Sequence, residues 1–135
     1  MRRYVFGTVI AISGLVFAAA PVRAHHSAAA AFDSTKPVTL TGVVTEVRLE
    51  NPHTWFFLDV TDTSGKVVNW GFEGTTPTAL IRSGYKRDSL KPGDRITVKG
   101  VRARDTDAPR GAASQITLVQ TGQTFTVGGG GQGNQ

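Results

Sequence analysis

The three histidines of the chain lie at two places that favour metal binding. His25 and His26 are adjacent near the N-terminus, and His53 follows Asn51-Pro52. If the mature protein began at His25, its α-amine and imidazole would chelate a metal, and His53 would add a third nitrogen. Such a planar nitrogen set, called a histidine brace, suits Cu(II), which heads the affinity order of the divalent first-row metals. The histidines therefore predict a copper site.

Other donor sets stay open at this point. His26 could supply the second imidazole, and Glu73 could supply an oxygen ligand if the fold brings it close. The alternative is that His25 and His26 are ordinary surface residues and that His53 only hydrogen-bonds a turn carbonyl or caps a strand. Zinc held by histidine alone would need three or four ligands, and the chain has no cysteine to help.

The N-terminus has the features of a Sec-type signal peptide. Two arginines precede a mainly apolar run over residues 4–20, and Val22 and Ala24 occupy the −3 and −1 positions. We predict cleavage after Ala24, a periplasmic or secreted protein, and no transmembrane span in the mature chain, with an uncleaved anchor as the alternative. Residues 1–24 carry three basic residues and no acid, so their removal lowers the net charge from +5 to +2.

The mature chain divides into an arm, a domain and a tail. We assign residues 25–36 to an N-terminal arm, 37–121 to a β domain, and the Gly-rich residues 122–135 to a disordered tail. A Thr-Pro pair followed by an apolar stripe predicts a short helix over about 78–83. Alternation of apolar and polar residues predicts five strands, over residues 38–49, 53–61, 66–73, 95–101 and 115–119.

Five strands with one short helix between the third and the fourth is the element order of the OB-fold, a partly open Greek-key barrel. We therefore predict an all-β, five-stranded, OB-fold-like barrel, with a generic β-sandwich as the alternative. Gly42 lies where the first strand changes phase and predicts a bend or bulge there. A mature chain of about 111 residues can bury a core without disulfides.

Aromatic residues on the second and third strands predict a second kind of site. In OB-folds this face binds oligonucleotides or oligosaccharides, and we take Trp55 and Trp70 as a candidate ligand platform. Side chains alternate along a strand, so Trp55 and Phe57 share one face while Phe56 and Leu58 share the other. Both faces cannot be core, although core packing or cover by the arm would explain most of these rings.

Charge and motifs exclude several classes of function. Basic residues concentrate in residues 82–110, with a net charge of +5, against −3 in residues 25–81. The basic segment could steer an anionic partner or form an ordinary solvated strand face, and an exported location argues against nucleic acid. Because no nucleophile elbow, paired carboxylates or phosphate-cradling loop is recognised, we expect a binding protein rather than an enzyme.

Several motifs resemble those of a family of small exported bacterial proteins known as a domain of unknown function, the one numbered 6152. The similar segments are Ala24-His25-His26-Ser27, Phe32-Asp33, residues 40–47, Asn51-Pro52-His53, residues 67–70 and residues 89–94. The resemblance covers about residues 24–120. It implies export and an OB-like barrel, and it supplies no established activity.

Two functions therefore remain open after the sequence. The first is a periplasmic OB-fold protein that holds a transition metal, with copper favoured, through His25, His53 and His26. The alternative is a metal-free envelope module that binds a protein, a glycan or another ligand on the aromatic or basic face of the barrel. A third possibility is a purely structural, stress-related envelope protein, for which the sequence offers no specific evidence.

Overall fold

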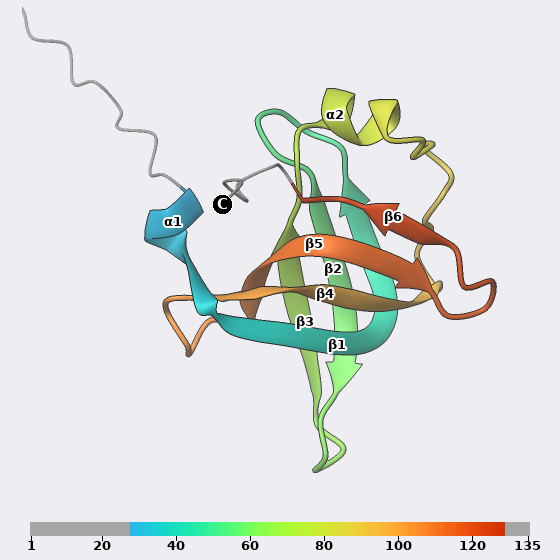
Figure 1. Cartoon of the computed structure of the whole chain (residues 1–135). Helices are drawn as coiled ribbons and strands as arrows, with labels where there is room; N and C mark the ends of the chain where they lie inside the picture. Colours follow the sequence, from blue (N-terminus) through green and yellow to red (C-terminus); the bar gives the residue numbers. More distant parts are fainter. Residues whose placement is uncertain (1–27, 129–135) are drawn as a thin grey trace, which may run out of the picture.

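Alternating apolar side chains build one sheet in the computed structural model, which describes residues 28–128 (Figure 1). The described elements are α1 (Ala28–Ala31), β1 (Phe32–Arg48), β2 (Trp55–Thr61), β3 (Val67–Glu73), α2 (Pro77–Arg82), β4 (Arg95–Ala103), β5 (Arg110–Leu118) and β6 (Thr124–Thr126). Within these residues, no helix is long and apolar enough to cross a membrane.

The first five strands close into a ring. Neighbouring strands run in the order β3-β2-β1-β4-β5-β6, and β3 also pairs in parallel with β5, where Gly71 lies opposite Arg110. The helix α2 lies in the connection from β3 to β4 (Figure 1). The predicted all-β, barrel-like class is confirmed, with its helix between the third and fourth strands.

The long strand β1 joins the two sides of the ring, because it pairs with β4 along its first part and with β2 along its last part. The change of partner occurs near Gly42, where the sequence predicts a bend. A Cβ on Gly42 would lie 3.0 Å from Leu58 Cδ1 and closer still to the Asp59 carbonyl, so β2 could not pass this close to a larger residue. A register shift between Val44 and Glu46 adds a β-bulge.

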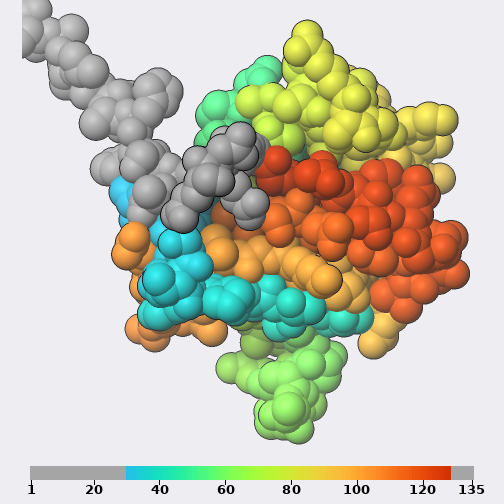
Figure 2. All heavy atoms as spheres, in the orientation of Figure 1, coloured from blue at the N-terminus to red at the C-terminus, as the bar shows by residue number. Residues whose placement is uncertain are grey.

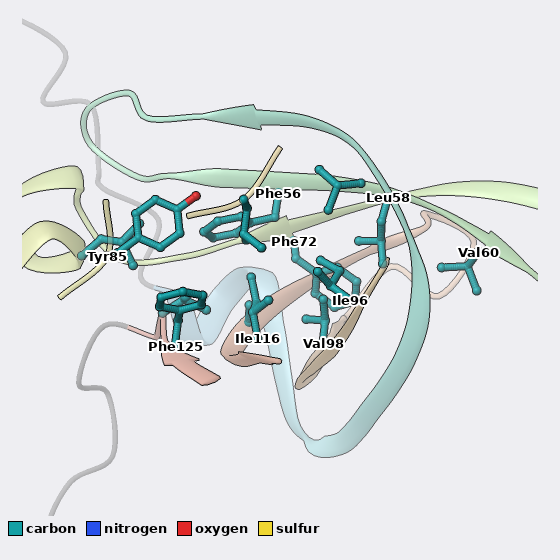
Figure 3. Packing of buried hydrophobic residues seen from close by; sticks show 14 residues of the cluster. Phe56, Leu58, Val60, Phe72, Tyr85, Ile96, Val98, Ile116 and Phe125 are labelled. Carbon is teal, nitrogen blue, oxygen red and sulfur yellow. The ribbon is translucent and has the colours of Figure 1, made fainter. Parts of the chain in front are cut away.

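Apolar side chains from every barrel strand fill the interior (Figure 3). Phe56, Phe72 and Ile96 are fully buried there, and Leu80 of α2 is buried in the same cluster. Tyr85, which follows α2, adds an aromatic ring to this cluster. Its ring meets Phe56 and Phe125 edge-on, at centroid distances of 6.3 and 5.3 Å, the arrangement that aromatic pairs prefer.

The first strand starts earlier than the sequence predicts. Residues 32–36, assigned to the arm, belong to β1, where Phe32 pairs with Ala103 of β4. A register shift before Pro37 interrupts the pairing. The strand was concealed in the sequence because the alternation of apolar residues starts only at Val38, after a polar run.

Part of the predicted tail is also folded. Thr124–Thr126 form β6, and Phe125 and Val127 are only 5% and 0% exposed. The Val127 N–H donates to the Ser114 carbonyl at 3.0 Å, and the Val127 carbonyl accepts from the Thr75 N–H at 2.6 Å. In Figure 2 the red β6 segment lies against the orange β5 segment. Residues 129–135 of the predicted tail and the predicted signal peptide lie outside the described residues.

Candidate functional site

The described histidine, His53, contacts a carboxylate. Its Nδ1 lies against Oε1 of Glu73. The imidazole is 45% exposed and the Glu73 carboxylate is 17% exposed, so the pair lies at the surface with the acid on its inner side. With Nδ1 engaged, Nε2 is the ring nitrogen that remains to bind a ligand. The fold therefore brings Glu73 next to His53.

Two strand ends position this pair, because His53 lies just before β2 and Glu73 ends β3. The fully buried Thr54 fastens the two segments together. Its N–H and its Oγ1 both donate to the Thr75 carbonyl at 2.9 Å, and its own carbonyl accepts from the Gly74 N–H at 2.8 Å. Thr54, which follows His53, and Gly74, which follows Glu73, are thus joined by a backbone hydrogen bond. The sequence analysis missed Thr54, whose only signal is its place directly after the Asn-Pro-His motif.

The remaining predicted ligands, His25 and His26, lie outside residues 28–128. Within that range, no group of three or more His, Asp or Glu side chains comes together to hold a metal ion. Among the described residues, His53 and Glu73 therefore form a pair and not a three-ligand cluster. The side-chain contact that the structure gives His53 is with the Glu73 carboxylate.

The two predicted platform residues lie on opposite faces of the β2–β3 pair. Trp70 is opposite Leu58 and Trp55 is opposite Glu73. Residues directly opposite share a face and side chains alternate along a strand, so Trp70 lies on the core side with Leu58 while Trp55 points outward. Trp70 stacks on Phe72 at a centroid distance of 5.8 Å. The structure does not bring the two tryptophans together.

Trp55 instead shares the outer face of the sheet with Phe57. The two rings stack at a centroid distance of 6.1 Å and an interplanar angle of 19°. The Phe57 ring lies over Gly71, because a Cβ on that glycine would be 3.0 Å from Phe57 Cε1. The guanidinium of Arg110 lies 5.0 Å from the Trp55 ring, and that of Arg48 lies 4.8 Å from the Phe57 ring. We call these five residues the outer aromatic face.

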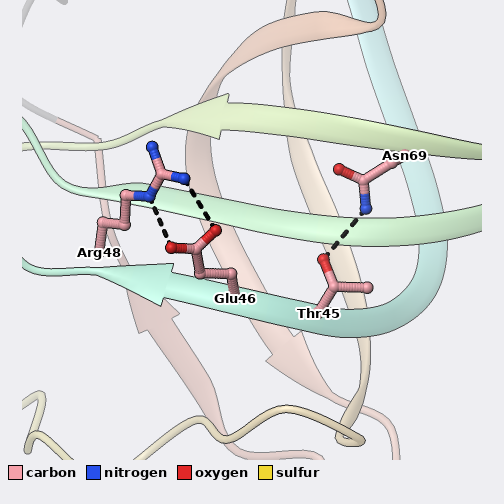
Figure 4. Close-up of polar contacts among 4 residues, drawn as sticks. All are labelled: Thr45, Glu46, Arg48 and Asn69. Carbon is pink, nitrogen blue, oxygen red and sulfur yellow. Dashed lines mark hydrogen bonds and ion pairs between the residues drawn. The ribbon is translucent and has the colours of Figure 1, made fainter.

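The two arginines of this face differ in their partners. Arg48 donates from Nε and Nη2 to the two carboxylate oxygens of Glu46, at 2.6 and 2.9 Å (Figure 4). This bidentate bond lowers the pKa of Glu46 and raises the pKa of Arg48. Among residues 28–128, the Arg110 guanidinium has the Trp55 ring as its contact and has no hydrogen bond or ion pair. Arg110 therefore keeps its donors for solvent or a ligand.

The side chain of Asn69 links the strands next to the outer aromatic face. Asn69 Nδ2 donates to Thr45 Oγ1 at 3.0 Å (Figure 4). It also donates to Asp59 Oδ1 at 2.8 Å, so Asn69 links β1, β2 and β3. These bonds fix the sheet beside the rings.

Comparison with known proteins yields one match. The model of a family described as a family of unknown function, DUF6152, matches residues 12–112. No curated protein and no solved structure matches the chain.

Proposed function

The chain belongs to the family of unknown function DUF6152, and from this premise we propose that it is an exported protein that captures or delivers a transition metal, namely copper. Export rests on the predicted signal peptide. Cleavage after Ala24 would make His25 the first residue and place the mature protein in the periplasm or outside the cell. The α-amine and imidazole of His25 would then join His53 as nitrogen donors, and His26 could add another.

The observation that carries the proposal is the contact between His53 and Glu73. A metal-binding histidine commonly donates its second ring N–H to a carboxylate, which fixes the tautomer and makes the ligating nitrogen more basic. Glu73 occupies Nδ1 of His53, so Nε2 is the proposed ligand atom. Glu73 is then the residue that orients the imidazole, rather than the oxygen ligand first considered.

The chain between the barrel and the N-terminus is long enough for His25 to join this pair. One cross-strand row links Asp33 of β1 to Phe72, the residue before Glu73, through Arg102 and Gly111. Its three interstrand steps span about 14 Å, and one residue along β3 to Glu73 adds about 3 Å. Eight residues connect Asp33 to His25, and a four-residue helix plus four extended residues reach at most about 20 Å.

The test is competition titration of Cu(II) with the chain that begins at His25. We expect His53→Ala to weaken the affinity strongly and Glu73→Gln to weaken it by about 10–100-fold, as loss of the carboxylate behind a ligating imidazole does. Glu46→Gln is the matched control, because Glu46 lies on the same sheet and its carboxylate accepts a hydrogen bond from Arg48. We expect this variant to bind as the wild type does.

A chain with a methionine ahead of His25 tests the N-terminal donors. The extra residue converts the α-amine into an amide, so the affinity should fall even though every side chain is kept. Equal Cu(II) affinity in the wild type and in a variant with both His25→Ala and His53→Ala would reject the proposal.

A further inference from the structure

We propose that one side of the barrel docks on an anionic phospholipid surface. The docking surface, which we call the basic strip, consists of five side chains between the end of α2 and the start of β4, namely Arg82, Lys86, Arg87, Lys91 and Arg95. This binding function shares only the predicted export with the proposed metal site. It rests on unpaired charges, on the contacts that hold the segment, and on exposed apolar residues beside it.

Positive charge is concentrated in this segment. Residues 82–95 contain five basic and two acidic residues, a net charge of +3, whereas the rest of residues 28–128 contains seven basic and eight acidic residues, a net charge of −1. All five basic residues of the strip are exposed. Within residues 28–128, none of their side chains forms a hydrogen bond or an ion pair. The strip therefore presents positive charge that no acid of the described chain neutralises by direct contact.

Contacts with the barrel hold the segment in place. Tyr85 and Leu90 are only 1% and 3% exposed and belong to the core cluster. Further along, the Gly93 N–H donates to the Val44 carbonyl, and the Val44 N–H donates to the Asp94 carbonyl, both at 2.8 Å. In Figure 2 the yellow and gold atoms of this segment lie on the outside of the molecule, at the upper right. A surface fixed in this way loses little conformational entropy on docking.

Exposed apolar residues lie beside the basic strip. Within residues 28–128, four large apolar residues are exposed, and three of them adjoin the strip. Ile81 directly precedes Arg82 and is 49% exposed. Val43 lies opposite Arg95 in the pairing of β1 with β4, and the Val119 N–H donates to the Arg95 carbonyl at 2.9 Å. Two exposed valines thus flank one base of the strip.

An anionic bilayer fits this combination of groups. Basic side chains attract a protein to the headgroups, and apolar side chains among them contact the boundary with the acyl chains. The bases are distributed along the segment from Arg82 to Arg95, which suits the diffuse negative charge of a headgroup layer. The predicted export places the chain at a membrane surface and away from nucleic acid. Each Lys or Arg near such a surface contributes about fivefold in affinity.

The experiment is co-sedimentation of the chain that begins at His25 with vesicles of phosphatidylglycerol and phosphatidylcholine in equal parts, and with vesicles of phosphatidylcholine alone. We expect binding to the first kind only, and weaker binding as the salt concentration rises. The combined substitutions Lys86→Gln and Arg87→Gln should weaken binding about 25-fold. The matched control combines Lys36→Gln and Lys66→Gln, which remove the same charge at exposed positions outside the strip. This variant should bind nearly as the wild type does.

One substitution at two valines tests the apolar contact. Val119 is 48% exposed beside the strip, and Val67 is 55% exposed at the start of β3, in the hairpin that projects from the barrel (Figure 1). Val119→Thr should weaken vesicle binding about two- to fourfold, because a methyl group that meets the bilayer becomes a hydroxyl. Val67→Thr should leave it unchanged. Thermal unfolding of each variant shows whether it is folded.

Five results would overturn the proposal. They are no binding to the anionic vesicles, equal binding to phosphatidylcholine alone, equal losses in the two double variants, equal losses in the two valine variants, and release from the vesicles by polyglutamate or oligo-dT at a matched concentration of negative charge. The last would assign the strip to an acidic protein or to a nucleic acid. Copper titration of the same variants is a separate readout, so failure here leaves the metal proposal to its own test.

Discussion

Alkaline pH should destabilise the barrel through one side chain, Tyr85. Its ring is 1% exposed and packs edge-on against two phenylalanines. Burial, reinforced by the carboxylates of Asp88 and Asp94, raises the pKa of Tyr85 to about 12. The mature chain would contain no other tyrosine, because Tyr4 lies in the predicted signal peptide. The absorbance of the tyrosine phenolate therefore reports this residue alone.

The size of the effect follows from the difference between the two protonation equilibria. In the unfolded chain Tyr85 should titrate near pH 10, while in the folded chain it titrates near 12. The folded state thus binds the proton more tightly, so stability is complete below pH 10 and falls as the pH rises toward 12 and beyond. The loss should be about 1.4 kcal/mol at pH 11 and approach about 2.7 kcal/mol above pH 12.

The assay is urea unfolding of the mature chain between pH 8 and pH 11.5, for the wild type and for Tyr85→Phe. We expect the wild type to lose about 1.4 kcal/mol more than Tyr85→Phe between pH 8 and pH 11. A direct titration should show phenolate forming near pH 12 or together with unfolding. A phenolate midpoint near pH 10 in a protein that is still folded would refute the reasoning.

Three further substitutions test the packing. Phe125→Ala should lower the free energy of unfolding by about 3 kcal/mol, because it opens a cavity in the core that β6 helps to close. A loss below about 0.5 kcal/mol, measured by chemical denaturation, would show that β6 is not part of the cooperative fold. Gly42→Ala should cost about 1–3 kcal/mol, since the new methyl meets the Asp59 carbonyl, and the exposed Thr41→Ala is its control. Gly71→Ala should displace the Phe57 ring and change the emission of Trp55 in a Trp70→Phe background, with an unchanged spectrum counting against the stacked geometry.

Local patterns were sufficient to predict most of the barrel. The alternation along residues 95–101 and the Thr-Pro start of α2 both correspond to observed elements, and Gly42 lies at the predicted bend. The two ends of the domain were placed less well. The polar run before Pro37 conceals the start of β1, which is held by pairing with β4 rather than by its own pattern. Residues 124–127 do alternate, but the Gly-rich composition after them outweighed that signal.

The sequence identified candidate residues, and the structure shows how they are arranged. The histidine motif indicated a metal donor at His53, and the fold brings Glu73 to it. The hydrogen bond from the buried Thr54 to the Thr75 carbonyl depends on the loop conformation, which the spacing of residues in the sequence does not predict. Trp55 and Trp70 were grouped because both lie on the second and third strands. Only the register of the strands, which fixes the face of each side chain, separates them.

The most direct test of the proposed copper site is the EPR spectrum of Cu(II) bound one-to-one to the chain that begins at His25. We predict hyperfine coupling to three nitrogen donors, namely the α-amine and imidazole of His25 and Nε2 of His53. His53→Ala should remove one nitrogen from that set, and Glu73→Gln should keep the nitrogen while weakening the binding. A spectrum that His53→Ala leaves unchanged would contradict the assignment of His53 as a ligand.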